Sequence, residues 1–509
     1  MTDRSWLIVY VPCLLLRLWI LFTQSAYIHP DEQFQCMQVA ADRLLESMEN
    51  SLEMPWEYVS GSLARSFLPV EVMCGVPFAI ARVGFASDLS TALFLLKMWM
   101  FLLSILGDLL VVIIAKRFSE VVNWRWVLVV RSTSWASVVF ATRTFSNVLE
   151  ALLLDALMVV WLGKDRVSLQ GAFVGGVLIG LGFFARITFP AFGAVIGLDA
   201  LRTEILHAVK KEGGELVSKR VFIHVVKFSA MVACGMFVAM ATQIAIDSRL
   251  NGRFVVAPIA NVMYNIKPSN LEKHGLHPIW THAIVNLQIL FGPLGPIALF
   301  RLLTHQIKTR IEITLAAAVL VPLGLLSLFP HQEFRFLFPL FTPLLLLGAQ
   351  SLRQDTSLKT RIVPRILFAV WIVFNLALGW LMGTAHQAGV TEGVQIAAKM
   401  CRDASPSSKR CCLVGRKVYM LPTYLLGDQI DRFKVMDQQR HDHEGSNHYE
   451  DRLGNCDIAL ILGPAQDVLN GNDNGGRRVV WRYEGFHFNS EAGGLVDLVI
   501  VKSSSAGRS

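Results

Sequence analysis

Two adjacent carboxylates, Asp31 and Glu32, stand in the segment His29-Pro30-Asp31-Glu32, directly after the first long apolar run of the chain. A run long enough to cross a bilayer places the residues that follow it at the boundary with water. A carboxylate held there can act as a general base that takes the proton of an attacking hydroxyl group. The alternative is structural, because acidic residues near a proline also cap the first turn of a helix. The spacing alone leaves both interpretations open.

Two further polar clusters interrupt the apolar sequence. One runs from Asn265 to His282, and its Pro and Gly residues indicate a loop. Its histidines, His274, His277 and His282, lack the compact spacing of a zinc motif, so capping and headgroup contacts are favoured over metal binding. The other cluster is His331-Gln332-Glu333-Phe334-Arg335-Phe336. Its charged side chains either pair with one another at a helix end or contact a substrate.

Several charged residues lie within or beside apolar segments, namely Arg143, Asp155, Arg186 and Asp247. Charge at membrane depth is costly, so such residues mark function or pair with neighbouring helices. Arginine presents a bidentate fork to phosphate, and histidine can lend a proton or a hydrogen bond. With a carboxylate at the boundary, these groups fit an enzyme that takes a sugar from a lipid phosphate in a single inverting displacement. The sequence shows no Gly-rich nucleotide loop and no Asp-x-Asp metal motif, which disfavours a soluble nucleotide-sugar donor.

The composition is that of a polytopic helical membrane protein. Hydrophobic residues make up 53% of the 509 residues and charged residues 17%, which is more apolar surface than one soluble core buries. Runs of roughly 17 to 25 mostly apolar residues recur up to residue 383. The expected spans, roughly eleven by hydropathy, are 6–26, 69–86, 91–115, 124–142, 147–163, 172–198, 221–246, 283–301, 311–329, 335–351 and 366–383. The first exceeds a signal-peptide core and contains Arg17, so we expect it to be retained.

Lysine and arginine gather in the connections 202–220, 301–310 and 353–365, which the positive-inside rule assigns to the cytosol. Counting spans from these connections puts residues 27–68, 247–282, 330–334 and 384–509 on the luminal side. Lys116 and Arg117 then fall on the luminal side, against the rule. The formal net charge of +8 follows mostly from this topology and implies no nucleic-acid partner.

Residues 1–383 are therefore expected to form a transmembrane domain, with the acidic motif in its first luminal loop at 27–68. In that loop, apolar residues at three- and four-residue steps from Phe34 to Leu52 predict a helix lying in the membrane interface. Asp42 and Arg43 would occupy its polar face.

Residues 384–509 are expected to form a small luminal α/β lobe. Its strand-like runs are 412–419, 456–462, 479–483 and 495–501, and its loops are 437–452, with His441 and His443, and 470–477. Cys13 and Cys234 lie in expected spans and are interpreted as apolar filler. The other cysteines, most of which would face an oxidising lumen, are Cys36, Cys74, Cys401, Cys411, Cys412 and Cys456. We expect a disulfide in the tail, although spacing does not give the pairing, and adjacent Cys411 and Cys412 are not expected to bond to each other.

The chain resembles the dolichyl-phosphate-mannose-dependent mannosyltransferases of glycosyltransferase family 22, which have a GT-C fold. The resemblance rests on strings that occur in the family's order between about residues 10 and 345: His29–Glu32, Thr142–Asn147 with Glu150, Arg186–Phe192, Asn270–Pro278 with Phe291–Leu294, and His331–Leu337. The fourth of these is most similar to the member that adds the fourth mannose to a GPI precursor. Ordered co-occurrence of these strings is more specific than any one of them.

The resemblance implies transfer of an α-1,2-linked mannose from dolichyl phosphate mannose to the third mannose of a GPI-anchor precursor. It implies a multi-pass protein of the endoplasmic reticulum membrane with a luminal active site. Asp31 is expected to be the general base, and Glu32 to orient it or to bind sugar hydroxyls. The residues expected to bind substrate are His29, Arg143, Arg186, Asp247, His274, His277, His331, Glu333 and Arg335. No metal or cofactor is expected, and the expected partners are the donor, the GPI glycolipid acceptor and membrane lipids.

Other functions remain open. A different member of family 22 would add the third GPI mannose or a branch mannose of the N-glycan lipid precursor. A transporter also has many spans and buried charges, but it should show inverted repeats, and the sequence has no such symmetry. A purely structural membrane subunit would tolerate neutralisation of both Asp31 and Glu32.

Overall fold

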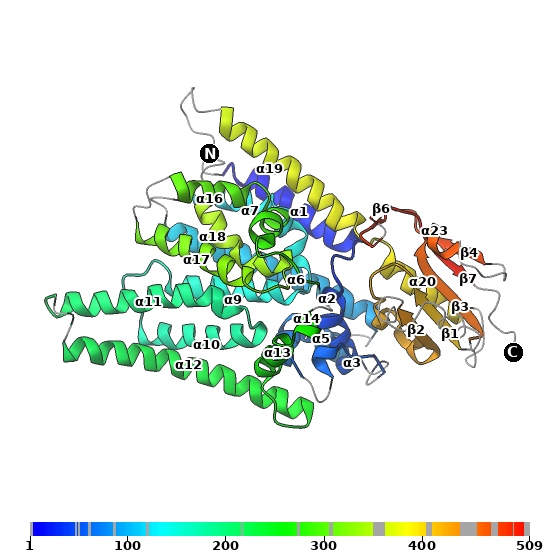
Figure 1. Cartoon of the computed structure of the whole chain (residues 1–509), viewed down its shortest axis with the longest axis horizontal. Coiled ribbons are helices and arrows are strands. Elements are labelled where there is room, and N and C mark those ends of the chain that lie inside the picture. The colour runs from blue at the N-terminus through cyan, green and yellow to red at the C-terminus, as the bar shows by residue number, and fades with distance from the viewer. Residues whose placement is uncertain are drawn as a thin grey trace. The chain divides into compact units, whose positions relative to one another are not determined.

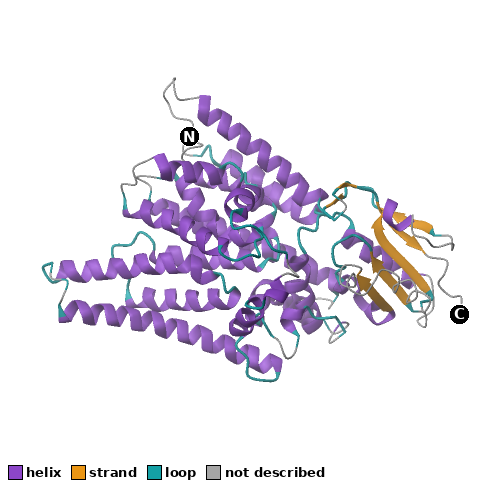
Figure 2. Ribbon diagram, in the orientation of Figure 1, coloured by secondary structure: helices purple, strands orange, loops and turns teal. Residues whose placement is uncertain are grey.

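The computed structural model describes residues 4–45, 48, 51–59, 63–84, 88–118, 122–214, 216, 218–271, 275–304, 309–349, 362–403, 410–437, 456–469, 477–491 and 493–502. The chain divides into two compact units. The helical unit comprises residues 1–18, 56–72 and 100–376, and the mixed unit comprises residues 19–55, 73–99 and 377–509. Within the described residues, strands occur only between 411 and 502, and helices form the rest of the regular structure (Figures 1 and 2).

Helices, most of them apolar, build the helical unit. They are η3 (Trp56–Tyr58), α4 (Phe67–Val70), α7 (Trp124–Ser132), α8 (Trp135–Val138), η5 (Phe140–Thr142), α9 (Ser146–Trp161), α10 (Leu169–Ala185), α11 (Phe189–Lys211), α12 (Lys219–Asn251), α13 (Ala257–Asn265), α14 (Pro268–Leu271), η7 (His282–Asn286), α15 (Leu287–Phe291), α16 (Leu294–Thr304), α17 (Arg310–Ser327), η8 (Phe334–Leu340) and α18 (Phe341–Gly348). Four more helices have residues in both units: α1 (Leu7–Thr23), η4 (Glu71–Gly75), α6 (Leu89–Arg117) and α19 (Ile362–Trp380).

Five of the described helices are long and apolar enough to cross a bilayer: Phe67–Gly84, Leu89–Arg117, Lys219–Asn251, Arg310–Ser327 and Ile362–Ala385. The pair Trp135–Thr142 and Ser146–Trp161 adds a sixth if it is counted as one span, and it is bent by 114° at residues 143–145. Shorter apolar helices occupy most of the other predicted spans. The predicted polytopic helical architecture is confirmed in this form, while the number of spans stays a prediction.

One predicted span, 172–198, is wrong because it contains two helices. Helix α10 ends at Ala185, where Arg186 adopts extended backbone angles (φ −155°, ψ 135°), and Pro190 lies in the first turn of α11. The two helices are antiparallel, because the backbone N–H of Val167, before α10, donates to Glu204, late in α11, at 2.5 Å. The chain therefore reverses direction at Arg186.

The extra helix corrects the placement of Lys116 and Arg117. The Arg117 guanidinium donates to the carbonyl groups of Met158 at 3.4 Å and Leu162 at 3.2 Å, at the end of α9. The end of the helical unit where Arg117 lies also contains the start of α10 and the Lys/Arg-rich connection after α11. The prediction that Lys116 and Arg117 face the opposite side was wrong, because one helix was missing from the count.

A five-stranded sheet forms the core of the tail in the mixed unit, with strand order β2-β1-β3-β7-β4. Its strands are β1 (Cys411–Gly415), β2 (Phe433–Asp437), β3 (Ile458–Pro464), β4 (Arg478–Arg482) and β7 (Leu498–Lys502). Strand β1 is parallel to β2 and β3, whereas β7 is antiparallel to β3 and β4. A separate hairpin pairs β5 (Phe488–Asn489) with β6 (Gly494–Leu495). The four predicted strand runs are confirmed, and β2 was missed because its short sequence, Phe-Lys-Val-Met-Asp, is polar at two of its five positions.

Three disulfides lie within the mixed unit: Cys36–Cys74, Cys401–Cys411 and Cys412–Cys456. The expected disulfide in the tail is thereby confirmed. Successive residues of a strand point to opposite faces of the sheet, so neighbours on β1 bond to different partners. Cys401 belongs to helix α20 (Val390–Asp403), and Cys412 and Cys456 lie in the apolar core beside the sheet. His441 and His443, and most of the two predicted tail loops, lie outside the described residues.

The predicted interfacial helix over residues 34–52 is shorter and more buried than expected. The chain forms α2 (Pro30–Glu32), the π-helix η1 (Gln33–Gln38) and α3 (Val39–Leu44), and the helix stops there. Phe34 and Ala41 are buried within the protein, so the apolar stripe packs internally and does not lie on a membrane surface. Asp42, expected on the polar face, is buried and accepts the backbone N–H of Leu52 at 3.0 Å.

Candidate active site

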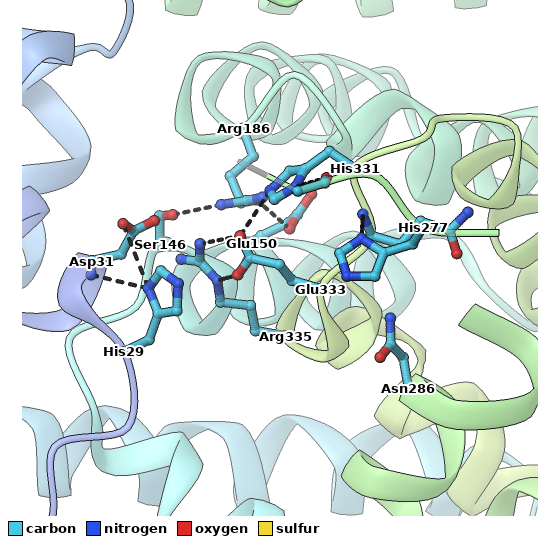
Figure 3. Close-up of polar contacts among 12 residues, drawn as sticks. His29, Asp31, Ser146, Glu150, Arg186, His277, Asn286, His331, Glu333 and Arg335 are labelled. Carbon is cyan, nitrogen blue, oxygen red and sulfur yellow. Dashed lines mark hydrogen bonds and ion pairs between the residues drawn. The ribbon is translucent and has the colours of Figure 1, made fainter. Parts of the chain in front are cut away.

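The acidic motif forms the first turn of α2 in the mixed unit. His29 caps this helix, because its Nδ1 accepts the backbone N–H of Asp31 at 3.1 Å (Figure 3). The same nitrogen lies 3.6 Å from Oδ1 of Asp31, whose side chain is 21% exposed. Helix capping was the structural role that the sequence left open for the two carboxylates. In the structure His29 caps the helix, and the carboxylate of Asp31 remains partly exposed.

Glu32 has a different environment from its neighbour. Its side chain is buried, and its Oε1 accepts the backbone N–H of Ile28 and the amide N–H of Gln33, both at 3.2 Å. An ionised carboxylate accepts hydrogen bonds and donates none, so these two contacts hold Glu32 against the backbone before the helix and against Gln33. The exposed member of the pair can meet a substrate, whereas the buried member supports the local backbone.

A second group of charged residues lies at the reversal between α10 and α11 in the helical unit. The Nε of Arg186 lies 3.1 Å from Oε2 of Glu150, and its Nη1 donates to Oγ of Ser146 at 2.9 Å (Figure 3). Ser146 and Glu150 are four residues apart, so they share one face of α9. The Thr188 hydroxyl donates to Oε1 of Glu150 at 2.6 Å. The break between two helices thus places a buried guanidinium against the first turn of a third.

The ring of Phe336 joins the predicted late motif to this group. The guanidinium carbons of Arg186 and Arg335 lie 5.1 Å and 5.4 Å from its centroid, within cation–π range. The ring of His331 lies edge-on to it at 5.5 Å. Glu333 pairs with both cations of the motif, through His331 Nε2 at 2.8 Å and Arg335 Nη2 at 2.9 Å. The charged residues of this motif therefore pair with one another, which was the structural alternative. Through Phe336 the motif also contacts Arg186.

Arg65 adds another guanidinium that the sequence did not indicate. Its Nη1 donates to Oγ of Ser146 at 3.2 Å, and its Nε lies 3.8 Å from Glu57. A serine oxygen accepts two hydrogen bonds, so one hydroxyl links two arginines. We call Arg65, Arg186, His331 and Arg335 the arginine cluster. The helical unit thus gathers four basic residues from three separate segments around one serine and one phenylalanine.

Burial lowers the pKa of His331, but the hydrogen bond and the negative charge of Glu333 raise it further, so the net shift of the pKa is upward. At a pH below this raised pKa the imidazole of His331 carries a proton, and His331 then adds positive charge to the arginine cluster. Being paired with a carboxylate, it can also donate a hydrogen bond to an anion.

The predicted histidine loop approaches the arginine cluster through Gln332. His277 Nδ1 accepts the backbone N–H of Gln332 at 3.4 Å, and its ring lies 6.4 Å from that of His331. The side-chain oxygen of Gln332 accepts the backbone N–H of His282 at 2.9 Å, and Asn286 lies 3.0 Å from His282 Nδ1. His274 lies outside the described residues.

Two other predicted substrate-binding residues, Asp247 and Arg143, are buried in the helical unit. Asp247 is buried at the end of α12, and its Oδ1 accepts the Ser66 hydroxyl at 3.1 Å and the Phe67 backbone N–H at 2.8 Å. It therefore fixes the residues that follow Arg65. Arg143 is buried at the 114° bend, one turn before α9.

Sequence reasoning missed Arg65, Ser146, Thr188 and Phe336 as site residues. The spacing of Ser146 and Glu150 was the one local indication, because polar residues four positions apart lie on the same face of a helix. Arg65 carried none, because it is separated from Ser146 by 81 residues. A polar residue in a loop gives no indication of the helix it will contact.

The sequence profile of the Alg9-like mannosyltransferase family matches residues 8–426. GPI mannosyltransferase 4 of Aspergillus oryzae is 32% identical over 447 residues, covering 83% of this chain and 78% of that protein. GPI mannosyltransferase 4 of Saccharomyces cerevisiae is 31% identical over 380 residues, covering 72% of this chain and 67% of that protein.

Among solved structures, the fold is similar to that of ArnT from Cupriavidus metallidurans. In its apo state ArnT gives a TM-score of 0.58 at 11% identity, with all of both chains covered. ArnT bound to undecaprenyl phosphate gives 0.54, also at 11% identity and full coverage. At this identity the likeness concerns the fold alone, which is the GT-C fold of multi-pass membrane glycosyltransferases.

Proposed function

Because the chain belongs to the Alg9-like mannosyltransferase family, and is therefore an enzyme, we propose that it transfers an α-1,2-linked mannose from dolichyl phosphate mannose to a GPI-anchor precursor. The acceptor position is the third mannose of that precursor. One observation carries the choice of pathway: relatives aligned along most of the chain are named GPI mannosyltransferase 4. We place the enzyme in the endoplasmic reticulum membrane, with its active site on the luminal side.

The arginine cluster is assigned to the phosphate of the donor. Transfer breaks the bond between the anomeric carbon and the phosphate oxygen, and the electron pair leaves with the lipid phosphate. Guanidinium groups and a protonated imidazole stabilise that negative charge as it develops. Three arginines and His331 gathered around Ser146 and Phe336 support this role. An ordered cluster needs little rearrangement when the charge forms.

Asp31 is assigned to the acceptor hydroxyl. The hydroxyl oxygen attacks the anomeric carbon on the face opposite the leaving phosphate, and its proton passes to the carboxylate. One base is enough, because the sugar hydroxyl takes the place that water has in a hydrolase. The 21% exposure of Asp31 and the burial of Glu32 support this division of roles. His29 orients Asp31 through the helix cap.

The remaining predicted residues take supporting roles in this proposal. His277 and His274 are assigned to the acceptor side, and Glu333 is assigned to holding His331 and Arg335 in place. Asp247 fixes Ser66 and Phe67 and so positions Arg65. Arg143 contributes charge next to α9. We retain the division into a transmembrane catalytic domain at 1–383 and a luminal C-terminal domain at 384–509 as part of the proposal.

The acceptor assignment is tested with membranes that contain this protein as the sole enzyme of its kind. They are incubated with labelled dolichyl phosphate mannose and GPI intermediates that carry two or three mannoses. We expect a labelled product only from the three-mannose acceptor. Product from the two-mannose acceptor would show a third-mannose enzyme, and product only from an N-glycan lipid precursor would remove the GPI assignment.

Donor binding should weaken as the pH rises through the raised pKa of His331. Below that pKa, His331 is cationic and both its pairing with Glu333 and its attraction for phosphate are present; above it, both are lost. The KM for the donor should therefore increase with pH in the range above about 6.5. His331→Gln should have a higher KM at low pH and a flatter profile. His207→Gln, on α11, is the control and should keep the original profile; an unchanged profile in His331→Gln would contradict the assignment.

A further inference from the structure

The acidic motif is held from both sides by the tail of the chain within the mixed unit. Before the motif, Tyr27 contacts His386 through two polar groups. The Tyr27 N–H donates to the His386 carbonyl at 2.8 Å, and the Tyr27 carbonyl lies 2.9 Å from His386 Nδ1. The Tyr27 hydroxyl donates to the carbonyl of Met420 at 3.1 Å. The buried Tyr27 ring packs edge-on against Tyr419 at 5.4 Å.

After the motif, two adjacent tail residues hold two glutamines of the π-helix η1. The Tyr424 hydroxyl donates to Oε1 of Gln33 at 2.6 Å, and the Thr423 hydroxyl donates to Oε1 of Gln38 at 3.1 Å. Gln33 and Gln38 are five residues apart, which in an α-helix would set them about 140° from each other. The i→i+5 bonding of a π-helix widens the turn and brings them toward one face. The unusual helix type therefore allows both contacts.

The contact at Tyr424 continues to the motif itself. Gln33 Nε2 donates to Oε1 of Glu32 at 3.2 Å, and that oxygen also accepts the backbone N–H of Ile28. Glu32 accepts hydrogen bonds but donates none when ionised, so the amide of Gln33 must turn its N–H toward Glu32 and its oxygen toward Tyr424. Burial, and then the charge of Glu32, raise the pKa of Tyr424, which therefore stays a donor at any working pH.

We propose that Tyr424 is a positioning residue of the active site, which acts through Gln33 and Glu32 to fix the turn that carries Asp31. This inference rests on the proposed function, since it takes Asp31 as the base. It gives the C-terminal lobe a defined part in catalysis: the segment Met420–Tyr424 is a support for the acidic motif. The Cys36–Cys74 and Cys401–Cys411 disulfides fix η1 and α20 within the same unit.

Tyr424→Phe removes only the hydroxyl group. We expect kcat to fall about tenfold, with the KM values for donor and acceptor nearly unchanged, because one buried hydrogen bond that orients a charged group is lost. Amide hydrogen exchange should become faster at Ile28, whose N–H is bound to Glu32, and across residues 28–38. Tyr483→Phe is the matched control in the same lobe, because its ring packs against Trp481 at 6.2 Å, and it should behave as the unmodified enzyme.

A double-mutant cycle tests the route from Tyr424 to Glu32. Gln33→Leu should lower kcat to a similar degree, and the double variant should be no worse than the poorer single variant, since both changes break one chain of contacts. Gln33→Leu also keeps the proposal testable if Tyr424→Phe does not accumulate. Additive effects, or a Tyr424→Phe enzyme with normal kcat and normal exchange at Ile28, would overturn the proposal.

Asp31→Asn, measured in the same membranes, separates this inference from the proposed function. If Asp31→Asn is inactive and Tyr424→Phe is normal, only the role of Tyr424 fails. If Asp31→Asn turns over normally, the assigned base is wrong, whatever Tyr424→Phe does.

Discussion

Asp31→Asn should abolish mannosyl transfer while leaving the amount of protein in the membrane unchanged. Asparagine has the same shape as aspartate but accepts no proton at neutral pH, so transfer loses its general base. Loss of general base catalysis typically lowers the rate by about 10² to 10⁴-fold. The fold should tolerate the change, because the contact that starts α2 uses the backbone N–H of Asp31 and the ring of His29, and the carboxylate is not needed for it.

The measurement is single-turnover transfer of labelled mannose at saturating acceptor, normalised to protein amount. Asp428→Asn is the matched control: its carboxylate is 64% exposed and lies 3.4 Å from Arg402 in the tail, so the same chemical change should leave the rate unaltered. Wild-type turnover by Asp31→Asn would remove Asp31 from the mechanism. It would favour a structural role for the motif, and Glu32→Gln would then be tested for a loss of protein amount.

The residues to which we assign the chemistry stand out in the sequence because they are polar residues in an apolar chain. Asp31, Arg186 and Arg335 are charged residues next to long hydrophobic runs, where charge is rarely incidental. Their partners were not predictable, since Ser146, Thr188 and Phe336 are ordinary residues for a membrane protein. What makes them part of the candidate site is the reversal of the chain at Arg186, which brings together segments that are far apart in the sequence.

That reversal was hidden by hydropathy. Residues on both sides of Arg186 are strongly apolar, so an average over a span-length window remains high across the break. The local signals were Arg186 itself and Pro190, because a proline disfavours helical geometry in the residue before it and is well tolerated in a first turn. The missing helix changed the side assigned to Lys116 and Arg117. One unrecognised turn therefore changed the side expected for the connection that begins at Lys116 and Arg117, while Ser66 and Phe67 stay at the end of the unit that holds Asp247.

The sequence predicts the strands of the tail, but it does not predict the contacts that the tail makes with the acidic motif. The runs at β1 and β3 are entirely apolar and entirely buried, which is a strong strand signal. By contrast, Tyr424 is separated from Gln33 by 391 residues, and neither residue has a neighbour that hints at the contact. Long-range pairs of this kind are not encoded in any local pattern.

Arg186→Lys should lower kcat/KM for the donor about 100-fold, or about 2.7 kcal/mol, which is the loss seen when one donor to a developing oxyanion is removed. Lysine keeps the charge but has a single ammonium group, whereas the guanidinium of Arg186 faces Glu150, Ser146 and Phe336 at once. Arg117→Lys is the matched control, because that guanidinium donates to the backbone carbonyls of Met158 and Leu162 at the end of α9 and should be dispensable for transfer.

A double variant that removes both charges of the Arg186–Glu150 ion pair tests whether Arg186 binds phosphate or only forms a structural ion pair. Arg186→Ala alone would leave the fully buried Glu150 without its counter-ion, and breaking a buried pair in this way destabilises a protein by about 3 to 5 kcal/mol. The double variant Arg186→Gln with Glu150→Gln removes both charges together, so the protein should still accumulate. If Arg186 stabilises the leaving phosphate, this double variant should lose at least as much kcat/KM for the donor as Arg186→Lys. If the pair only joins α9 to the turn after α10, the double variant should transfer mannose normally, and the phosphate assignment of the arginine cluster would have to be abandoned.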